Sequence, residues 1–163
     1  MPPWRPAPPC SAALPQPPPL LKPKPPEEAR MLDTVTQSRS ETPAKVSQKI
    51  AIVIYSNVTT EALSRAYRAF GFAAELMAAG DDVTIVFDGG GSATLAAVLD
   101  PKHDLHRAWT RVAPALRGVC GYCAKAYDVQ DTLKAAGIPM LTDDHGHASL
   151  RALLGEGRQI VTF

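Results

Sequence analysis

Short β-branched apolar runs alternate with amphipathic helical segments from Lys49 to the end of this 163-residue chain. The first run, KIAIVIYS at 49–56, is continuously apolar, which is typical of a strand buried on both faces of a parallel sheet. Apolar residues at helical spacing follow from Thr59 or Thr60, and Gly80 ends that helix. Because helices separate the strands, successive strands run in the same direction and helices cover both faces. The sequence therefore predicts a three-layer α/β/α domain with a mostly parallel sheet of about five strands.

The same patterns predict the remaining elements. Further strands are expected within 82–92, which opens into a glycine loop, and at 118–119, 138–141 and 158–163. Helices are expected around 95–99 and over 105–116, 123–136 and 147–154.

The first part of the chain has a different composition. Residues 1–30 hold 12 of the 16 prolines, and proline fixes φ and donates no backbone hydrogen bond. We therefore expect a disordered Pro-rich tail and linker over 1–48 and a folded domain over 49–163. Two alternatives for the tail are an SH3-type ligand in PPPLLKPKPP and translation that begins at Met31.

Charge and hydropathy exclude several classes of partner. The formal net charge is +1, so the chain lacks the excess of positive charge that binds nucleic acid or an anionic membrane surface. No apolar run approaches the roughly 20 residues that span a bilayer. The three cysteines, Cys10, Cys120 and Cys123, are too few and too uneven for a secreted disulfide framework. We expect a cytoplasmic protein in which a close thiol pair is catalytic or binds metal.

That thiol pair lies in RGVCGYCAKA, directly before a predicted helix. A helix N-terminus stabilises a thiolate, so Cys120 is the expected nucleophile and Cys123 its resolving partner. The alternative is that both are small buried apolar residues. A thioredoxin-type site is disfavoured, because the motif lies late in a parallel α/β chain.

The glycine loop is expected beside the thiols. Asp88, Gly89 and Gly90 follow the second strand, and the carboxyl ends of parallel strands meet at one edge of a sheet. We therefore expect these residues and Tyr122 to line the cleft. Neither a dinucleotide-binding nor a Walker pattern is present, so a tight turn with close backbone approach is favoured over nucleotide binding.

Two histidines give weak evidence for a metal site. His145 and His147 in TDDHGHASL could complete a zinc site with the two cysteines. Their spacing is unusual for zinc, and no second Cys-x-x-Cys is present, so we expect exposed loop histidines, no metal and no dissociable cofactor.

The segments KIAIVIYS, FDGGGS, GVCGYCAKAYDV and QIVTF together resemble the DsrE/DsrF-like superfamily, especially its small YchN-like members, over residues 49–163. The resemblance implies a homo-oligomer, commonly a trimer or hexamer, that carries sulfane sulfur as a persulfide on one cysteine. Cys120 matches that cysteine, and Cys123 matches a second one found in some branches. Asp128 stands where the family usually has glycine.

We therefore expect a sulfur carrier or sulfurtransferase that acts through Cys120, with sulfur donor and acceptor proteins as partners. Cys123 is expected to release the sulfur by forming a disulfide, or to protect the thiol from over-oxidation. The alternatives are a non-catalytic oligomeric module that binds a small ligand or metal, and a thiol–disulfide redox protein.

Overall fold

A computed structural model of the chain describes residues 47–58 and 60–163. These residues form a five-stranded sheet with the order β4-β3-β2-β1-β5, and every strand pair is parallel. The strands are β1 (Lys49–Ile54), β2 (Asp82–Phe87), β3 (Leu116–Cys120), β4 (Met140–Leu141) and β5 (Gln159–Thr162). The predicted fold class is confirmed. The predictions for the Pro-rich tail, Cys10 and Met31 lie outside the described residues.

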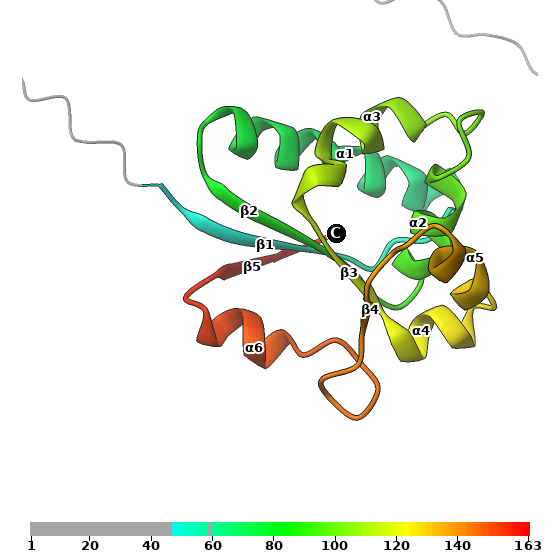
Figure 1. The fold of residues 1–163 in the computed structure, drawn as a ribbon. Coiled ribbons are helices and arrows are strands. Elements are labelled where there is room, and N and C mark those ends of the chain that lie inside the picture. The colour runs from blue at the N-terminus through cyan, green and yellow to red at the C-terminus, as the bar shows by residue number, and fades with distance from the viewer. Residues whose placement is uncertain (1–46, 59) are drawn as a thin grey trace, which may run out of the picture. The chain divides into compact units, whose positions relative to one another are not determined.

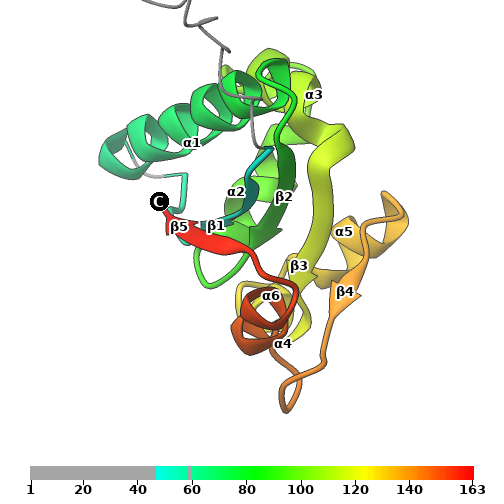
Figure 2. The same cartoon turned by 90° about the vertical axis from the view of Figure 1, so that its left-hand side faces the viewer.

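Helices lie on both sides of this sheet, with α1 and α3 over one face and α6 over the other (Figures 1 and 2). The helices are α1 (Thr60–Ala78), α2 (Gly91–Val98), α3 (His106–Val112), α4 (Gly121–Ala126), α5 (Gln130–Ala135) and α6 (Leu150–Gly155), and a 3₁₀ turn, η1, spans Ala113–Ala115. None of the helices within the described residues is long and apolar enough to cross a membrane.

The two faces of β1 explain its continuous apolar run. Successive side chains of a strand point to opposite faces. Ile52 and Ile54 pack in the larger core beneath α1 and α3, where Trp109 lies 5.6 Å from Phe87 between ring centroids. Val53 packs on the opposite face in a smaller cluster. Both faces are buried, as the sequence pattern indicates for a central parallel strand.

The predicted helix over 105–116 is too long, and the third strand is longer than predicted. The helix α3 ends at Val112, Pro114 lies in the 3₁₀ turn η1, and Leu116 already belongs to β3. Proline lacks the backbone N–H that a continuing helix needs. Leu116 then pairs with Ile85 of β2, so sheet formation takes over at that point.

The single helix predicted over 123–136 is wrong, because the structure has two helices there. The first, α4, ends at Ala126, and α5 begins at Gln130. Between them Asp128 has a φ of +56°, and the backbone N–H of Val129 donates to the carbonyl of Ala124 at 2.9 Å. A left-handed residue followed by such a hydrogen bond is typical of a helix C-terminus. Aspartate is among the few non-glycine residues that tolerate this conformation, so composition alone did not reveal the break.

Candidate functional site

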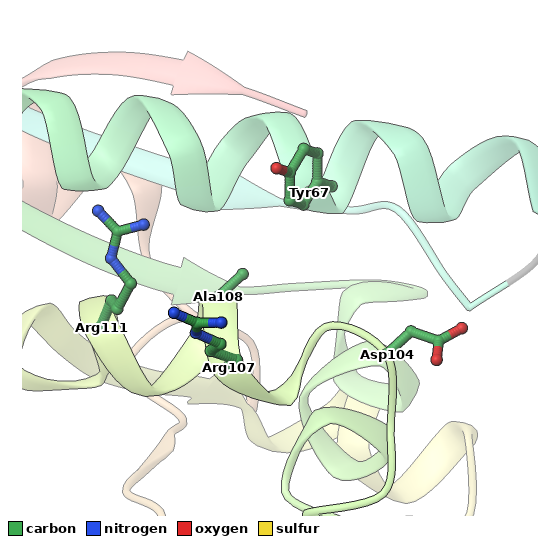
Figure 3. A pocket seen from close by; sticks show the side chains of 5 residues that line it. All are labelled: Tyr67, Asp104, Arg107, Ala108 and Arg111. Atoms are coloured by element: carbon green, nitrogen blue, oxygen red, sulfur yellow. The ribbon is translucent and has the colours of Figure 1, made fainter.

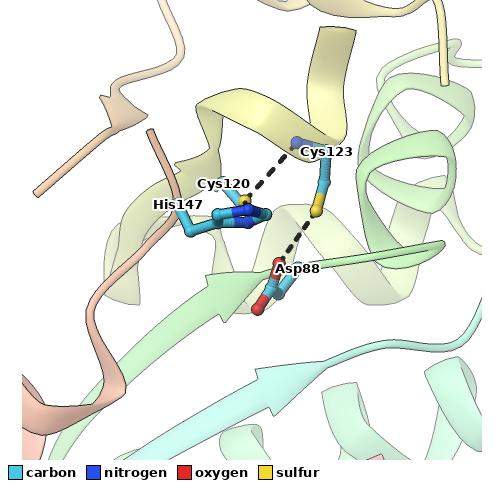
Figure 4. Close-up of side chains that lie close together, drawn as sticks. All are labelled: Asp88, Cys120, Cys123 and His147. Atoms are coloured by element: carbon cyan, nitrogen blue, oxygen red, sulfur yellow. Dashed lines mark hydrogen bonds between the residues drawn. The ribbon is translucent and has the colours of Figure 1, made fainter. Parts of the chain in front are cut away.

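The candidate site lies at the carboxyl ends of β2 and β3, which are neighbours in the sheet. Phe87, the last residue of β2, pairs with Val119 of β3, so Asp88, which follows β2, and Cys120, the last residue of β3, lie at the same edge of the sheet. Figure 4 shows four side chains that converge there: Asp88, Cys120, Cys123 and His147. One potential ligand atom from each lies within 4.8 Å of those of the other three.

Cys120 is the last residue of β3 and the N-cap of α4. Its Sγ accepts a hydrogen bond from the backbone N–H of Cys123 at 3.4 Å and lies 3.5 Å from Nδ1 of His147. The side chain is fully buried and packs in the cluster beneath α6. Cys120 therefore has the burial that the alternative interpretation of the motif predicted, although it also caps a helix as the nucleophile interpretation predicted.

Cys123 differs from Cys120 in exposure and in hydrogen bonding. It is half-buried, and its S–H donates to Oδ1 of Asp88 at 3.1 Å. Burial, followed by the hydrogen bonds with Cys120 and Asp88, raises the pKa of the Cys123 thiol to about 12. Cys123 is therefore a protonated thiol at neutral pH and a weak nucleophile.

His147 is not the exposed loop histidine that the sequence indicated. It is half-buried, and its ring lies 4.3 Å from that of Tyr122 between centroids. The backbone N–H of Tyr122 donates to the carbonyl of Gly146 at 2.8 Å, which ties the histidine loop to the start of α4. No local sequence signal reveals this contact, because Cys120 and His147 are 27 positions apart. His145, two positions away, is exposed.

The other two histidines of the chain have structural partners: His103 lies between α2 and α3, and His106 is the first residue of α3. Nδ1 of His106 lies 2.8 Å from the carbonyl oxygen of Val98, and Nδ1 of His103 accepts a hydrogen bond from the N–H of Leu105 at 3.2 Å. Both contacts organise the connection from α2 to α3.

The glycine loop forms a tight turn with a close backbone approach. Gly89 has a φ of +51°, and its N–H donates to Oδ1 of Asp88 at 2.8 Å. A Cβ on Gly90 would lie 2.9 Å from Cβ of Asn57, and one on Gly91 would lie 1.9 Å from the carbonyl oxygen of Ile54. The glycines therefore let the β2–α2 connection pass against the end of β1, and they orient Asp88.

Partly exposed tyrosines surround the four converging side chains. Tyr55 and Tyr122 are 39% and 58% exposed. Burial and the adjacent Asp88 carboxylate, which accepts a hydrogen bond from Tyr55, raise the pKa of Tyr55. A hollow of about 400 Å³ is lined by Tyr122, Lys125 and Ala126. The sequence pointed to Tyr122 through the thiol motif, but it offered no signal for Tyr55.

A second hollow of about 390 Å³ lies where α3 faces α1 (Figure 3). Its lining residues are Tyr67, Asp104, Arg107, Ala108 and Arg111. None of the four converging side chains lines it, and it brings together no nucleophile or metal-ligand set.

No protein-family model and no curated protein sequence matches the chain. Among solved structures, a conserved protein of unknown function from Bacteroides thetaiotaomicron has a similar fold, with a TM-score of 0.51 and 12% sequence identity. The match covers 71% of this chain and 95% of that one. At this identity the similarity supports the three-layer α/β fold alone.

Proposed function

We propose that this domain carries sulfane sulfur as a persulfide on Cys120, in the manner of DsrE-like sulfur-relay proteins. The proposal rests on the different environments of the two neighbouring thiols, Cys120 and Cys123. Sγ of Cys120 accepts an N–H hydrogen bond and lies 3.5 Å from a ring nitrogen of His147, which can act as a base toward it. Cys123 is held as a thiol against Asp88.

Sulfur loading is a displacement at the outer sulfur of a donor persulfide, R–S–SH. The proton of the Cys120 thiol moves to Nδ1 of His147, which lies 3.5 Å from Sγ. The thiolate then attacks the outer sulfur, a new S–S bond forms on Cys120, and the donor leaves as the thiolate R–S⁻.

Sulfur release uses the second thiol. Cys123 transfers its proton to the Asp88 carboxylate, 3.1 Å away, and attacks Sγ of Cys120. A disulfide forms between the two cysteines, and hydrosulfide leaves. A thiol reductant supplies the two electrons that return the disulfide to two thiols.

The burial of Cys120 restricts the donor. A reagent reaches Sγ only after neighbouring side chains move, so inorganic polysulfide is a better first donor than a protein persulfide.

The family resemblance extends the proposal to the whole protein. It supports a cytoplasmic homo-oligomer, a trimer or hexamer, with donor and acceptor proteins. The left-handed conformation of Asp128 is in keeping with this resemblance, because the family usually has glycine at that position.

The test is intact-mass measurement of reduced, metal-free protein after incubation with polysulfide. We expect the wild type and Cys10→Ser to take up one sulfur atom and release it as hydrosulfide, which leaves the Cys120–Cys123 disulfide, whereas Cys120→Ser takes up none. Cys123→Ser should keep the adduct and release hydrosulfide more slowly. An adduct that persists in Cys120→Ser, or no adduct on Cys123→Ser, would contradict the proposal. Unchanged hydrosulfide release from Cys123→Ser would contradict the role of Cys123 alone.

A further inference from the structure

We propose that the four converging side chains at the carboxyl ends of β2 and β3 form a zinc site whose ligands are Asp88, Cys120, Cys123 and His147. This site goes beyond the proposed function and does not depend on it. It also reverses the expectation of no metal. That expectation counted histidine spacing along the sequence, whereas the fold brings in one histidine and one aspartate from separate loops.

The separations between the ligand atoms suit a tetrahedral zinc ion. Bonds of about 2.3 Å to sulfur and about 2.0–2.2 Å to nitrogen and oxygen place the ligand atoms of a tetrahedral site about 3.4–3.8 Å apart. Sγ of Cys120 lies 3.5 Å from Nδ1 of His147, and Sγ of Cys123 lies 3.1 Å from Oδ1 of Asp88. All four ligand atoms lie within 4.8 Å of one another, so only small side-chain shifts are needed.

The chemistry of the ligands selects zinc among the common metals. Two sulfur ligands disfavour Mg²⁺ and Ca²⁺, which take oxygen ligands. A tetrahedral set of two thiolates, one imidazole and one carboxylate suits Zn²⁺, a borderline-soft ion without a geometric preference of its own. The two thiols lose their protons as the metal binds. The two thiolates then balance the ion's charge of +2, and the carboxylate leaves the site with a net charge of −1.

Neighbouring groups already orient three of the four ligands, as is usual around metal sites. The ring of Tyr122 stacks against His147 at an interplanar angle of 34°. The N–H of Gly89 donates to the Asp88 carboxylate at 2.8 Å, and the side chain of Tyr55 lies beside that carboxylate. Cys120 is fixed as the last residue of β3. The site is therefore largely formed before any ion binds.

A bound zinc ion would occupy both thiolates. With four protein ligands, the site is closed and leaves no position for a reacting water, as in structural zinc sites. In a chain that holds zinc, neither Cys120 nor Cys123 is then free to accept sulfur. This last consequence, unlike the site itself, rests on the proposed function.

The experiment adds Zn²⁺ to the reduced, metal-stripped full chain in the absence of any sulfur donor, removes free metal, and measures bound zinc by elemental analysis. We expect one zinc per chain and an increase in the thermal midpoint. Substitution with Co²⁺ should produce the visible spectrum of tetrahedral cobalt with thiolate charge transfer.

Substitutions test whether the proposed ligands, and not nearby residues, bind the zinc ion. Cys123→Ser and His147→Gln should lose stoichiometric zinc while their circular dichroism matches that of the metal-free wild type. Cys10→Ser and His145→Asn serve as controls and should keep it. Asparagine is chosen at His145 because φ there is +49°, which asparagine tolerates.

The proposal is overturned if the folded wild type retains no zinc, if Cys123→Ser and His147→Gln retain it, or if Cys10→Ser loses it. The sulfur adduct is measured on metal-free protein, and zinc is measured without a sulfur donor. Failure of either measurement therefore leaves the other intact.

Discussion

At Gly91, one close backbone contact leaves no room for a side chain. It begins α2 where that helix passes the end of β1. A Cβ at this position would lie 1.9 Å from the carbonyl oxygen of Ile54 and 2.8 Å from its carbonyl carbon. Both atoms belong to the backbone of a central strand, so neither side can move without disturbing the sheet. The contact lies two residues beyond Gly89 and so also fixes the path of the loop that presents Asp88.

Gly91→Ala is therefore expected to lower the free energy of unfolding by at least about 2 kcal/mol, because the new methyl group overpacks a rigid contact. Gly71→Ala is the matched control, since Gly71 is exposed in α1 and a Cβ there meets nothing within 4 Å. That change should raise the free energy of unfolding by about 0.5–1 kcal/mol through helix propensity. Urea denaturation measures both, and equal effects of the two substitutions would contradict the steric argument.

At the scale of elements, the break after α4 separates this helix, which contains Cys123 and is capped by Cys120, from α5. Asp128 adopts a φ of +56°, and its N–H donates to the carbonyl of Lys125 at 3.1 Å. The break lets Leu133 of α5 turn into the larger core while α4 stays at the site. A single helix over the same residues could not both place Leu133 in the core and keep the first turns at the site.

Asp128→Ala should lower the free energy of unfolding by about 1 kcal/mol, because alanine is strained in the left-handed conformation. Asp128→Gly should not lower it, since glycine adopts this conformation freely. Thermal and urea unfolding of the three proteins test the order. If alanine were as stable as glycine at this position, the positive φ would not be what sets the break.

At the scale of the molecule, one network of charges joins segments that are far apart in the sequence. Glu156, after α6, pairs with Arg117 of β3 at 2.6 Å and with Arg158 at 2.9 Å. Arg158 also reaches Asp82 at the start of β2, at 3.0 Å. These pairs connect β2, β3 and the segment between α6 and β5 at the end of the sheet opposite the thiols.

Hydrogen bonds from Arg117 and Arg158 lower the pKa of Glu156. A carboxyl whose pKa is lowered by folding stabilises the native state fully above its unfolded pKa of about 4.3, and this stabilisation disappears as the pH falls through the lower folded pKa. We therefore expect Glu156→Gln to show a smaller loss of stability than the wild type as the pH falls below about 4.

Urea denaturation between neutral and acidic pH measures this difference. Glu75→Gln, an exposed carboxylate of α1, is the control and should follow the wild-type profile more closely. High salt should reduce the difference for Glu156→Gln, because the Glu156 carboxylate is exposed and dissolved ions screen its attraction to the two arginines. Identical acid profiles for the wild type and Glu156→Gln would show that the network contributes nothing to stability.

Short-range sequence patterns were enough to predict the α/β class and most of the order of helices and strands. Burial on both faces makes a strand such as β1 continuously apolar, and glycine ends α1, so each signal lies within a few neighbouring residues. The two wrongly predicted helix ends also have local causes, but these causes do not change the spacing of apolar residues. Pro114 ends α3 early, and Asp128 takes a conformation usually reserved for glycine.

The sequence by itself determined the thiol pair, its place before a helix and its nearness to the Asp88 loop, because neighbouring parallel strands end at one edge. Only the tertiary structure decided that Cys120 is buried and that His147 joins it. Those outcomes depend on the path of the loop from β4 to α6 and on packing beneath α6. Such contacts between distant residues leave no periodicity in the sequence.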